Sequence, residues 1–306
     1  MPLGIDISSN SIRIVAISHI DNEVVVEDVA MSSLPPGIVS GSLVTDIKAV
    51  GKIIKKSIAD QRIKAKSCII SIGARDAHID FQSFPKMSNG ERIKASKVIA
   101  SQFLPNISEA DVAITLEAVI GRENYFMRGF AVKSVVDSRV AAAKAAGLNV
   151  LAVDHEMFAW YRSAPIADAV LDIGQGKATL TVFRQPLPES HSFDFDLADS
   201  YEASLRHMLE AILESRSSGS TIETIVLVGD VSNSDSFAED LERETHLRVG
   251  YVDAPLRSNI NGGQSLNGEE ASPEWLLAYG LALWSLPHDQ FIIARQNNSS
   301  GVERMS

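Results

Sequence analysis

The chain has a single cysteine, and this scarcity excludes a framework of intramolecular disulfides. Cys68 lies in the apolar run "CIISIG", so we predict a buried strand residue in a protein of the reducing cytosol. The sequence has no apolar run near the roughly 20 residues that a membrane-spanning helix needs. It also has no basic segment followed by an apolar one at its start, as a signal peptide would. These absences predict a cytoplasmic protein without direct membrane insertion.

Positive charge is also scarce. The 28 Lys and Arg residues are outnumbered by 39 Asp and Glu, which leaves a net charge of −11. The cations are not gathered along a stretch that could follow a phosphate backbone, so we predict no nucleic-acid partner. Four lysines (Lys48, Lys52, Lys55 and Lys56) recur along one expected helix, where a solvated face explains them.

The two halves of the chain open with the same pattern. Residues 3–18 read "LGIDISSNSIRIVAIS" and residues 169–184 read "AVLDIGQGKATLTVFR". Each places a carboxylate, Asp6 or Asp172, at the end of an apolar strand, before a turn of small residues and a second strand. The offset of 166 residues is much longer than a solenoid repeat. The repeat therefore predicts two similar halves that face each other across a cleft.

Each half is expected to follow the order βββαβαβα. In the first half we predict strands at 3–7, 12–18, 23–29 and 68–72, a helix capped by Thr45 or Asp46, and a strand and helix within 149–163. In the second half we predict strands at 169–173, 179–183, 191–195, 224–228 and 247–252, and helices after Ser200, at 235–245 and at 273–286, the last with Ser272 and Pro273 at its start.

An αβ unit interrupts the first half. It contains a helix with Ser88 and Glu91 as a capping box, strands near 112–119 and 125–132, and an alanine-rich helix capped by Asp137 that stops at Gly147. The predicted domains are 1–76 with 149–167 (first half), 77–148 (inserted αβ subdomain), 168–287 (second half) and 288–306 (disordered tail).

The paired hairpins suggest a phosphate site. Successive backbone N–H groups in a tight turn form an anion-binding concavity, and small side chains leave room for a phosphate. A carboxylate beside the turn suits Mg²⁺, which prefers oxygen ligands. The candidate phosphate-binding residues are Ser8, Ser9, Asn10, Ser11 and Arg13 in the first hairpin and Gly174, Gln175, Gly176 and Thr179 in the second, with Asp6 and Asp172 as candidate magnesium ligands.

At these hairpins the sequence resembles the actin-like ATPases, and within them the type IV pilus assembly protein PilM, a relative of the cell-division protein FtsA. Three later stretches resemble the same family in the same order, and the likeness spans 3–286: "SLPPGIVSGSLVTDIKAVGKIIKKSI", "AVDHEMFAWYRS" and "PEWLLAYGLALW". The resemblance implies an actin-like (ribonuclease H-like) α/β fold of duplicated halves, with ATP and Mg²⁺ as cofactors.

The sequence departs from the family pattern at the expected cleft. Ser8 stands where the family has Gly, Arg13 stands where it has Lys, and Asp230 follows Gly229 on the adenosine side in place of a second Gly. The segment between 191 and 224 has no room for an upper subdomain in the second half. We therefore predict a reduced family member with a degenerate nucleotide cleft, in which ATP and Mg²⁺ binding stays open.

Glu156 has two interpretations. It lies where related filament-forming ATPases carry a catalytic acid, and a Glu in the first turn of a helix is also favoured by the helix dipole alone. Because of the degenerate cleft, the prediction leans toward a protein that is not an enzyme.

The resemblance also implies a partner. PilM-like proteins bind the cytoplasmic N-terminal peptide of the membrane protein PilN, which would hold this chain at the inner membrane. The corresponding groove would use the 77–84 strand, the linker at 84–87 and the helix at 91–103. The candidate peptide contacts are Ile79, Phe81, Phe84 and Met87, for which core packing is the alternative.

Two other functions are alternatives to this scaffold. One is a working Mg-ATPase that regulates pilus or filament assembly, and the other is a small-molecule kinase of the same superfamily. The kinase needs a catalytic Asp between the halves, for which the sequence offers no convincing motif. Self-association stays open.

Overall fold

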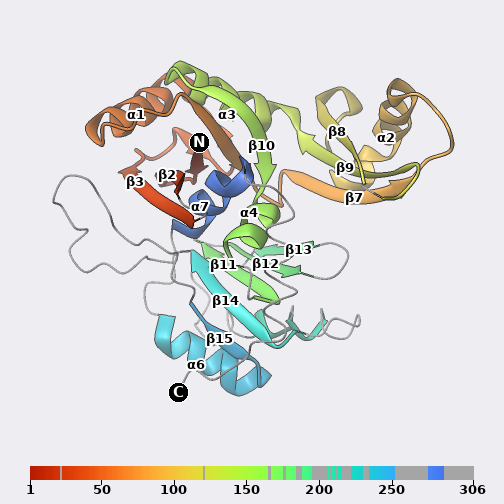
Figure 1. Ribbon diagram of the computed structural model, residues 1–306. Coiled ribbons are helices and arrows are strands. Elements are labelled where there is room, and N and C mark those ends of the chain that lie inside the picture. The colour runs from red at the N-terminus through yellow and green to blue at the C-terminus, as the bar shows by residue number, and fades with distance from the viewer. Residues whose placement is uncertain are drawn as a thin grey trace.

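A computed structural model describes most of the chain. The described residues are 1–20, 23–119, 121–164, 167–174, 177–183, 188–194, 206, 208–210, 212–214, 222–229, 234–251 and 275–285. Figure 1 shows two sheet-and-helix halves, one above the other, and a smaller unit projecting to the side of the upper half.

The first half is built on a five-stranded sheet. Its strands are β1 (Leu3–Ile7), β2 (Ser11–Ile20), β3 (Glu23–Ser33), β6 (Ser67–Ile72) and β10 (Asn149–His155). The strand order is β10-β6-β1-β2-β3, with β1, β6 and β10 parallel and β2 and β3 antiparallel to their neighbours. All five residues of β1 are buried, as expected for a central strand covered on both faces.

The second half repeats this sheet. Its strands are β11 (Ala169–Gly174), β12 (Lys177–Phe183), β13 (Pro188–Asp194), β14 (Thr224–Gly229) and β15 (Arg248–Gly250). The order β15-β14-β11-β12-β13 matches that of the first sheet, strand for strand and direction for direction. Even the hairpin register agrees, because Asp6 lies opposite Arg13 and Asp172 lies opposite Thr179. The predicted duplication is confirmed.

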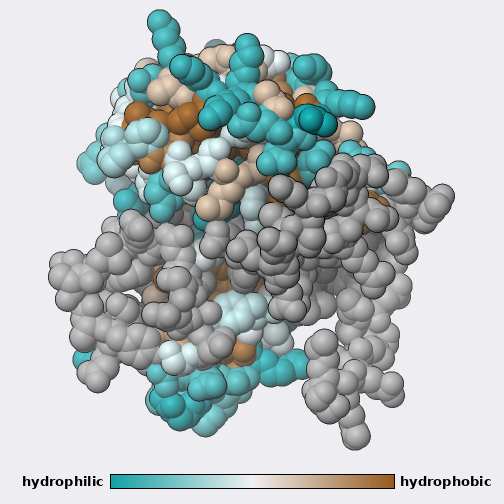
Figure 2. Space-filling model, turned by 90° about the vertical axis from the view of Figure 1, so that its left-hand side faces the viewer, coloured by the Kyte–Doolittle hydropathy of each residue, from teal (hydrophilic) through white to brown (hydrophobic). Residues whose placement is uncertain are grey.

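Helices cover these sheets. They are α1 (Ile47–Asp60), α3 (Lys133–Ala145), α4 (Glu156–Ser163), α6 (Ser234–Thr245) and α7 (Leu276–Ala282), the last followed by a 3₁₀ turn at Leu283–Ser285. A short hairpin of β4 (Val39–Ser40) and β5 (Leu43–Val44) precedes α1, and the Asp46 carboxylate caps that helix by accepting a bond from the Ala49 N–H. The side of the molecule that carries α1 faces the viewer in Figure 2, where hydrophilic side chains project from its upper part.

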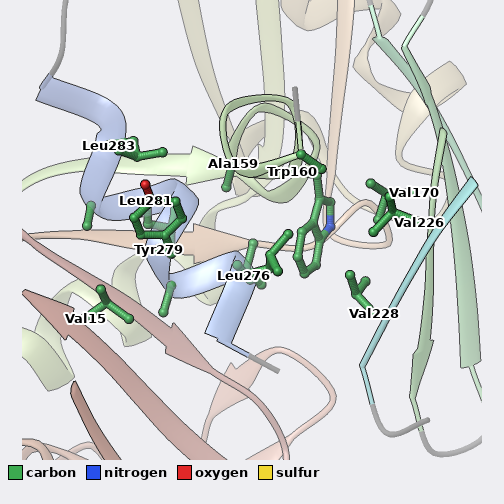
Figure 3. Packing of buried hydrophobic residues seen from close by; sticks show 14 of the residues in the cluster. Val15, Ala159, Trp160, Val170, Val226, Val228, Leu276, Tyr279, Leu281 and Leu283 are labelled. Carbon is green, nitrogen blue, oxygen red and sulfur yellow. The ribbon is translucent and has the colours of Figure 1, made fainter. Parts of the chain in front are cut away.

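Helix α7 joins the two halves. Its backbone lies against β1 and α4 so closely that a Cβ atom on Gly4 would stand 1.8 Å from the Ala278 carbonyl oxygen, and one on Gly280 would stand 2.1 Å from that of Ala159. Around it a single hydrophobic cluster takes in Trp160 of α4 and residues of both sheets. Figure 3 shows the Trp160 ring between Leu276 on one side and valines of the second half on the other.

A three-stranded sheet forms the projecting unit. Its strands are β7 (Ala77–Ser83), β8 (Val112–Ala118) and β9 (Tyr125–Val132), in the order β7-β9-β8 and antiparallel throughout. Helix α2 (Asn89–Phe103) packs on one face, and a 3₁₀ turn at Glu109–Asp111 leads into β8. The capping box of Ser88 and Glu91 is present, as predicted.

One predicted helix start is wrong. The alanine-rich helix begins at Lys133, a turn before Asp137, because β9 runs directly into it. Asp137 instead pairs with Lys133 on the exposed helix face. The predicted caps at Ser200, Ser272 and Pro273 and the tail at 288–306 lie outside the described residues, and the domain boundaries stay a prediction. In the described part of the chain, no helix combines the length and apolarity needed to cross a bilayer.

Candidate functional site

The first hairpin turn is held by its own side chains. The Ser8 hydroxyl accepts a bond from the Ser11 N–H at 3.1 Å and donates to Asn10 Oδ1 at 2.8 Å, and the Ser8 N–H donates to the Ser11 carbonyl at 2.9 Å. Ser9 and Asn10 are exposed at the tip. The Ser11 N–H group is thus already hydrogen-bonded to the Ser8 side chain, which leaves one backbone donor fewer for a phosphate at this turn.

Asp6 lies buried at the end of β1, with cations around it. Its Oδ2 is 3.6 Å from Nη1 of Arg13, and Ser71 Oγ donates to Oδ1 at 3.1 Å. Burial raises the pKa of Asp6, and the guanidinium groups of Arg13 and Arg139 oppose that rise. A magnesium ion bound directly by Asp6 would have to compete with these two arginines, so its metal role stays a prediction.

Arg139 of α3 is the member of this cluster that sequence reasoning missed. Its Nε donates to the Ser42 carbonyl at 2.8 Å, Nη1 to the Ser71 carbonyl at 3.0 Å, and Nη2 to the Ile7 carbonyl at 3.0 Å. The side chain is 4% exposed, and burial lowers its pKa. One guanidinium therefore ties the ends of β1 and β6 to the β4–β5 turn.

A sequence signal for Arg139 existed. The buried positions of α3 are Val135, Ser138, Arg139, Ala142 and Ala143, which follow the i, i+3, i+4, i+7, i+8 spacing of an inward stripe. A charged residue on such a stripe must be paired or hydrogen-bonded, because burying an isolated charge is costly.

Glu156 belongs to the same cluster. Its Oε1 accepts a bond from the Ala74 N–H at 2.8 Å, and a Cβ on Gly73 would stand 3.2 Å from Oε2. Burial is the main cause of the raised pKa of Asp6, and the negative charge of Glu156 adds to that rise. Glu156 is thus a buried residue that anchors the loop after β6, and its catalytic role stays a prediction.

The second hairpin carries the other candidate residues. Asp172 is half-buried near the end of β11, Gly174 ends that strand, and Thr179 is buried on β12. Gly229 ends the adjacent strand β14 at φ +91, where a Cβ would stand 2.4 Å from the Ile173 carbonyl oxygen and 2.5 Å from Asp172 Oδ1. Glycine is therefore required there both by its backbone conformation and by its close approach to Asp172.

Three candidates, Gln175, Gly176 and Asp230, lie outside the described residues, as does most of the segment predicted to lack an upper subdomain. Within the described ranges, no group of three or more His, Cys, Asp or Glu side chains is arranged to hold a metal ion.

The candidate peptide residues divide between two faces of the three-stranded sheet. Ile79 and Phe81 are half-buried on the face opposite α2, where Phe81 lies across from Met127 and its ring centroid is 6.1 Å from that of Tyr125. We call Ile79, Phe81, Tyr125 and Met127 the peptide face. Their packing provides an apolar surface on a sheet whose other face is covered by α2.

Phe84 and Met87 follow β7 and differ in exposure. Phe84 is 9% exposed, packs edge-on against Phe126 and lies under the Arg128 guanidinium at 5.7 Å. Arg128 is itself paired with Asp80, on the α2 side of the sheet. Phe84 is therefore buried in the packing of this unit, whereas Met87 is half-buried in the linker to α2, and a contact of either residue with a peptide stays a prediction.

Comparison with solved structures defines the fold of the chain. A structure described as "PilM-PilN type IV pilus biogenesis complex" matches with a TM-score of 0.76 at 18% identity, covering 94% of this chain and 98% of that one. The ethanolamine utilization protein EutJ from Carboxydothermus hydrogenoformans matches with a TM-score of 0.55 at 15% identity, covering 93% of this chain and 89% of its own. A Bacteroides thetaiotaomicron protein with an actin-like ATPase fold and unknown function matches at 0.51 and 11% identity, with 82% and 90% covered. The chain has the actin-like ATPase fold.

The sequence comparison is more specific. Residues 4–105 match the family described as "Type IV pilus assembly protein PilM". The predicted resemblance to that family is confirmed, and the matched segment contains the turn of the first hairpin, α1 and the whole of α2.

Proposed function

We propose that this protein is a cytoplasmic scaffold of a type IV pilus or related secretion assembly at the inner membrane. It binds the short N-terminal segment of a PilN-like membrane protein, which holds it at the membrane. The family match over 4–105 and the fold shared with a PilM–PilN complex support this proposal.

The observation that carries the proposal is the peptide face. Phe81, Tyr125 and Met127 lie together, and α2 packs on the opposite side of the sheet. The face begins at the junction with the first half, because Ala77 and Ala131 pack there against Ile72 and Val153. An extended or helical segment that buries apolar anchors on such a surface gains affinity without any chemistry.

The edge of the same sheet adds a second mode of contact. Strand β7 pairs with β9 and, within the described residues, with no other strand. Its outer backbone groups can therefore accept an added strand, which supplies main-chain hydrogen bonds while side chains on the peptide face supply selectivity.

The test is a titration of the full chain with synthetic peptides from the cytoplasmic N-terminus of a PilN-like protein. We expect binding that Phe81→Ala weakens by roughly 30-fold, because truncating a central aromatic anchor costs about 2 kcal/mol or more. The matched control is Val98→Ala, since Val98 is 68% exposed on α2 and outside the peptide face. An equal loss of peptide affinity in the two variants, with both folded, would contradict the assignment of the peptide face as the binding site.

Nucleotide binding is a second candidate function. Two hairpins of the same register, with Asp6 and Asp172 at matching positions and the close approach of Gly229 to Asp172, favour it. The Ser8 bond to Ser11 and the arginines around Asp6 oppose it on the first-half side. Calorimetric titration with Mg-ATP tests whether the cleft binds a nucleotide. We expect no heat of binding for the wild type. Micromolar binding that is lost in Asp6→Ala/Asp172→Ala would instead establish a working cleft.

A further inference from the structure

A quarter of the Lys and Arg residues of this acidic protein lie in one short segment. Residues 47–66 contain seven Lys and Arg and one acid, Asp60, for a local charge of +6. Because the whole chain carries −11, the remaining residues carry −17. Such segregation is not needed for folding, and it creates a local positive field on a negative molecule.

The structure arranges four of these cations as one surface. Lys48, Lys52, Lys55 and Lys56 are all exposed on α1, and we call them the basic face. At about 100° per residue they fall within an arc of roughly 100°, and Lys48 and Lys56 are about 12 Å apart along the axis. The opposite side of the helix holds the buried residues Val50, Gly51, Ile54 and Ser57. The basic face therefore points away from the core.

The helix that carries these lysines is firmly held. A Cβ on Gly51 would stand 2.7 Å from the Ala145 Cβ and 2.9 Å from the Ala142 carbonyl oxygen, so α1 and α3 are in close backbone contact. Val50 and Ile54 are fully buried in the first-half core. The lysines thus project from a rigid support, and their side of the molecule shows projecting hydrophilic side chains in Figure 2.

Further cations are exposed near α1. Arg62, Lys64 and Lys66 are exposed in the segment that follows α1. Lys144 is exposed on α3, beside the residues of that helix that contact Gly51. In the part of the chain that the structure describes, the ion pairs involve other cations and leave the four lysines of the basic face without a carboxylate partner. Their charge is available to an outside anion.

We propose that the basic face binds the anionic headgroups of a lipid membrane. Lysines act as separate, hydrated point charges on flexible stems, which suits a diffuse layer of phosphates better than a shaped pocket, where arginine forks are preferred. Each Lys near an anionic bilayer strengthens adsorption by about fivefold. The contact is electrostatic adsorption and needs no inserted segment.

This lipid contact goes beyond the proposed scaffold role and does not use the peptide face. It would orient the chain with α1 toward the membrane while the projecting sheet engages a partner. Failure of one proposal leaves the other intact, because peptide binding and lipid binding are measured separately and by different variants.

The experiment is flotation of the full chain with phosphatidylcholine vesicles that contain or lack about one-third phosphatidylglycerol, at low and high salt. We expect binding only to the anionic vesicles, and a loss of binding as salt shortens the screening length from about 10 Å at 0.1 M to about 3 Å at 1 M. The variant Lys52→Glu/Lys56→Glu is expected to bind at least about 25-fold more weakly, because two contributions of about fivefold are lost. Thermal unfolding checks that it is folded.

Two controls separate position from net charge. Lys86→Glu/Lys94→Glu changes the charge by the same amount at exposed positions of the projecting unit and is expected to bind like the wild type. Lys52→Arg/Lys56→Arg keeps the charge and is expected to retain binding. Equal weakening by both glutamate variants, no binding of the wild type at low salt, or tighter binding to duplex DNA or RNA than to the vesicles would each overturn the proposal.

Discussion

Replacing Arg139 by alanine tests whether the buried cluster at the end of β1 holds the first half together. The substitution removes the donor from the carbonyl oxygens of Ile7, Ser42 and Ser71, and it removes one of two cations near Asp6. Each buried polar group left without a partner costs about 1–3 kcal/mol, and breaking a buried charged contact costs about 3–5 kcal/mol. Water that enters the vacated space restores part of the lost hydrogen bonding. We therefore expect a loss of about 3–5 kcal/mol in the free energy of unfolding.

The assay is urea unfolding of the full chain, followed by circular dichroism. Lys144→Ala is the matched control, because Lys144 is exposed on the same helix and its loss should change stability by no more than about 0.5 kcal/mol. Arg139→Lys keeps the charge but loses the planar guanidinium group, so its loss in the free energy of unfolding should lie between those of Arg139→Ala and Lys144→Ala. A loss below about 1 kcal/mol for Arg139→Ala would refute the assignment of this residue as the tie between the three segments.

Two further predictions concern packing and pH. Gly280→Ala should lower the free energy of unfolding by about 2–3 kcal/mol, because its Cβ would meet the α4 backbone. The control Gly90→Ala has open space around the new Cβ and should be neutral or stabilising. Equal shifts of the unfolding temperature in the two variants would contradict this account of α7 packing. Asp6 has a pKa raised above 3.8, so the stability that its protonation provides is fully present below that pH and is lost as pH rises through the folded-state pKa. The wild type should therefore gain stability relative to Asp6→Asn as pH falls from neutral toward about 4, and urea midpoints that stay parallel over this range would show that Asp6 is not responsible.

The local pattern of the sequence determined the elements and their repetition. Alternating apolar residues, small turn residues and the Ser88–Glu91 capping box act within a few positions of the chain, so strands, hairpins and the start of α2 were predictable. The start of α3 was not, because the helix follows β9 without a loop and Asp137 makes a side-chain pair in place of a cap.

The tertiary structure alone decided which distant side chains meet. Arg139 reaches the ends of strands more than 60 residues away, and the choice between surface and core for Phe81 and Phe84 depends on which side of the β7 sheet faces α2. The sequence by itself determined a duplicated actin-like chain with paired hairpins. Which distant side chains surround Asp6, and which apolar and basic faces stay uncovered, followed from long-range packing that no local pattern encodes.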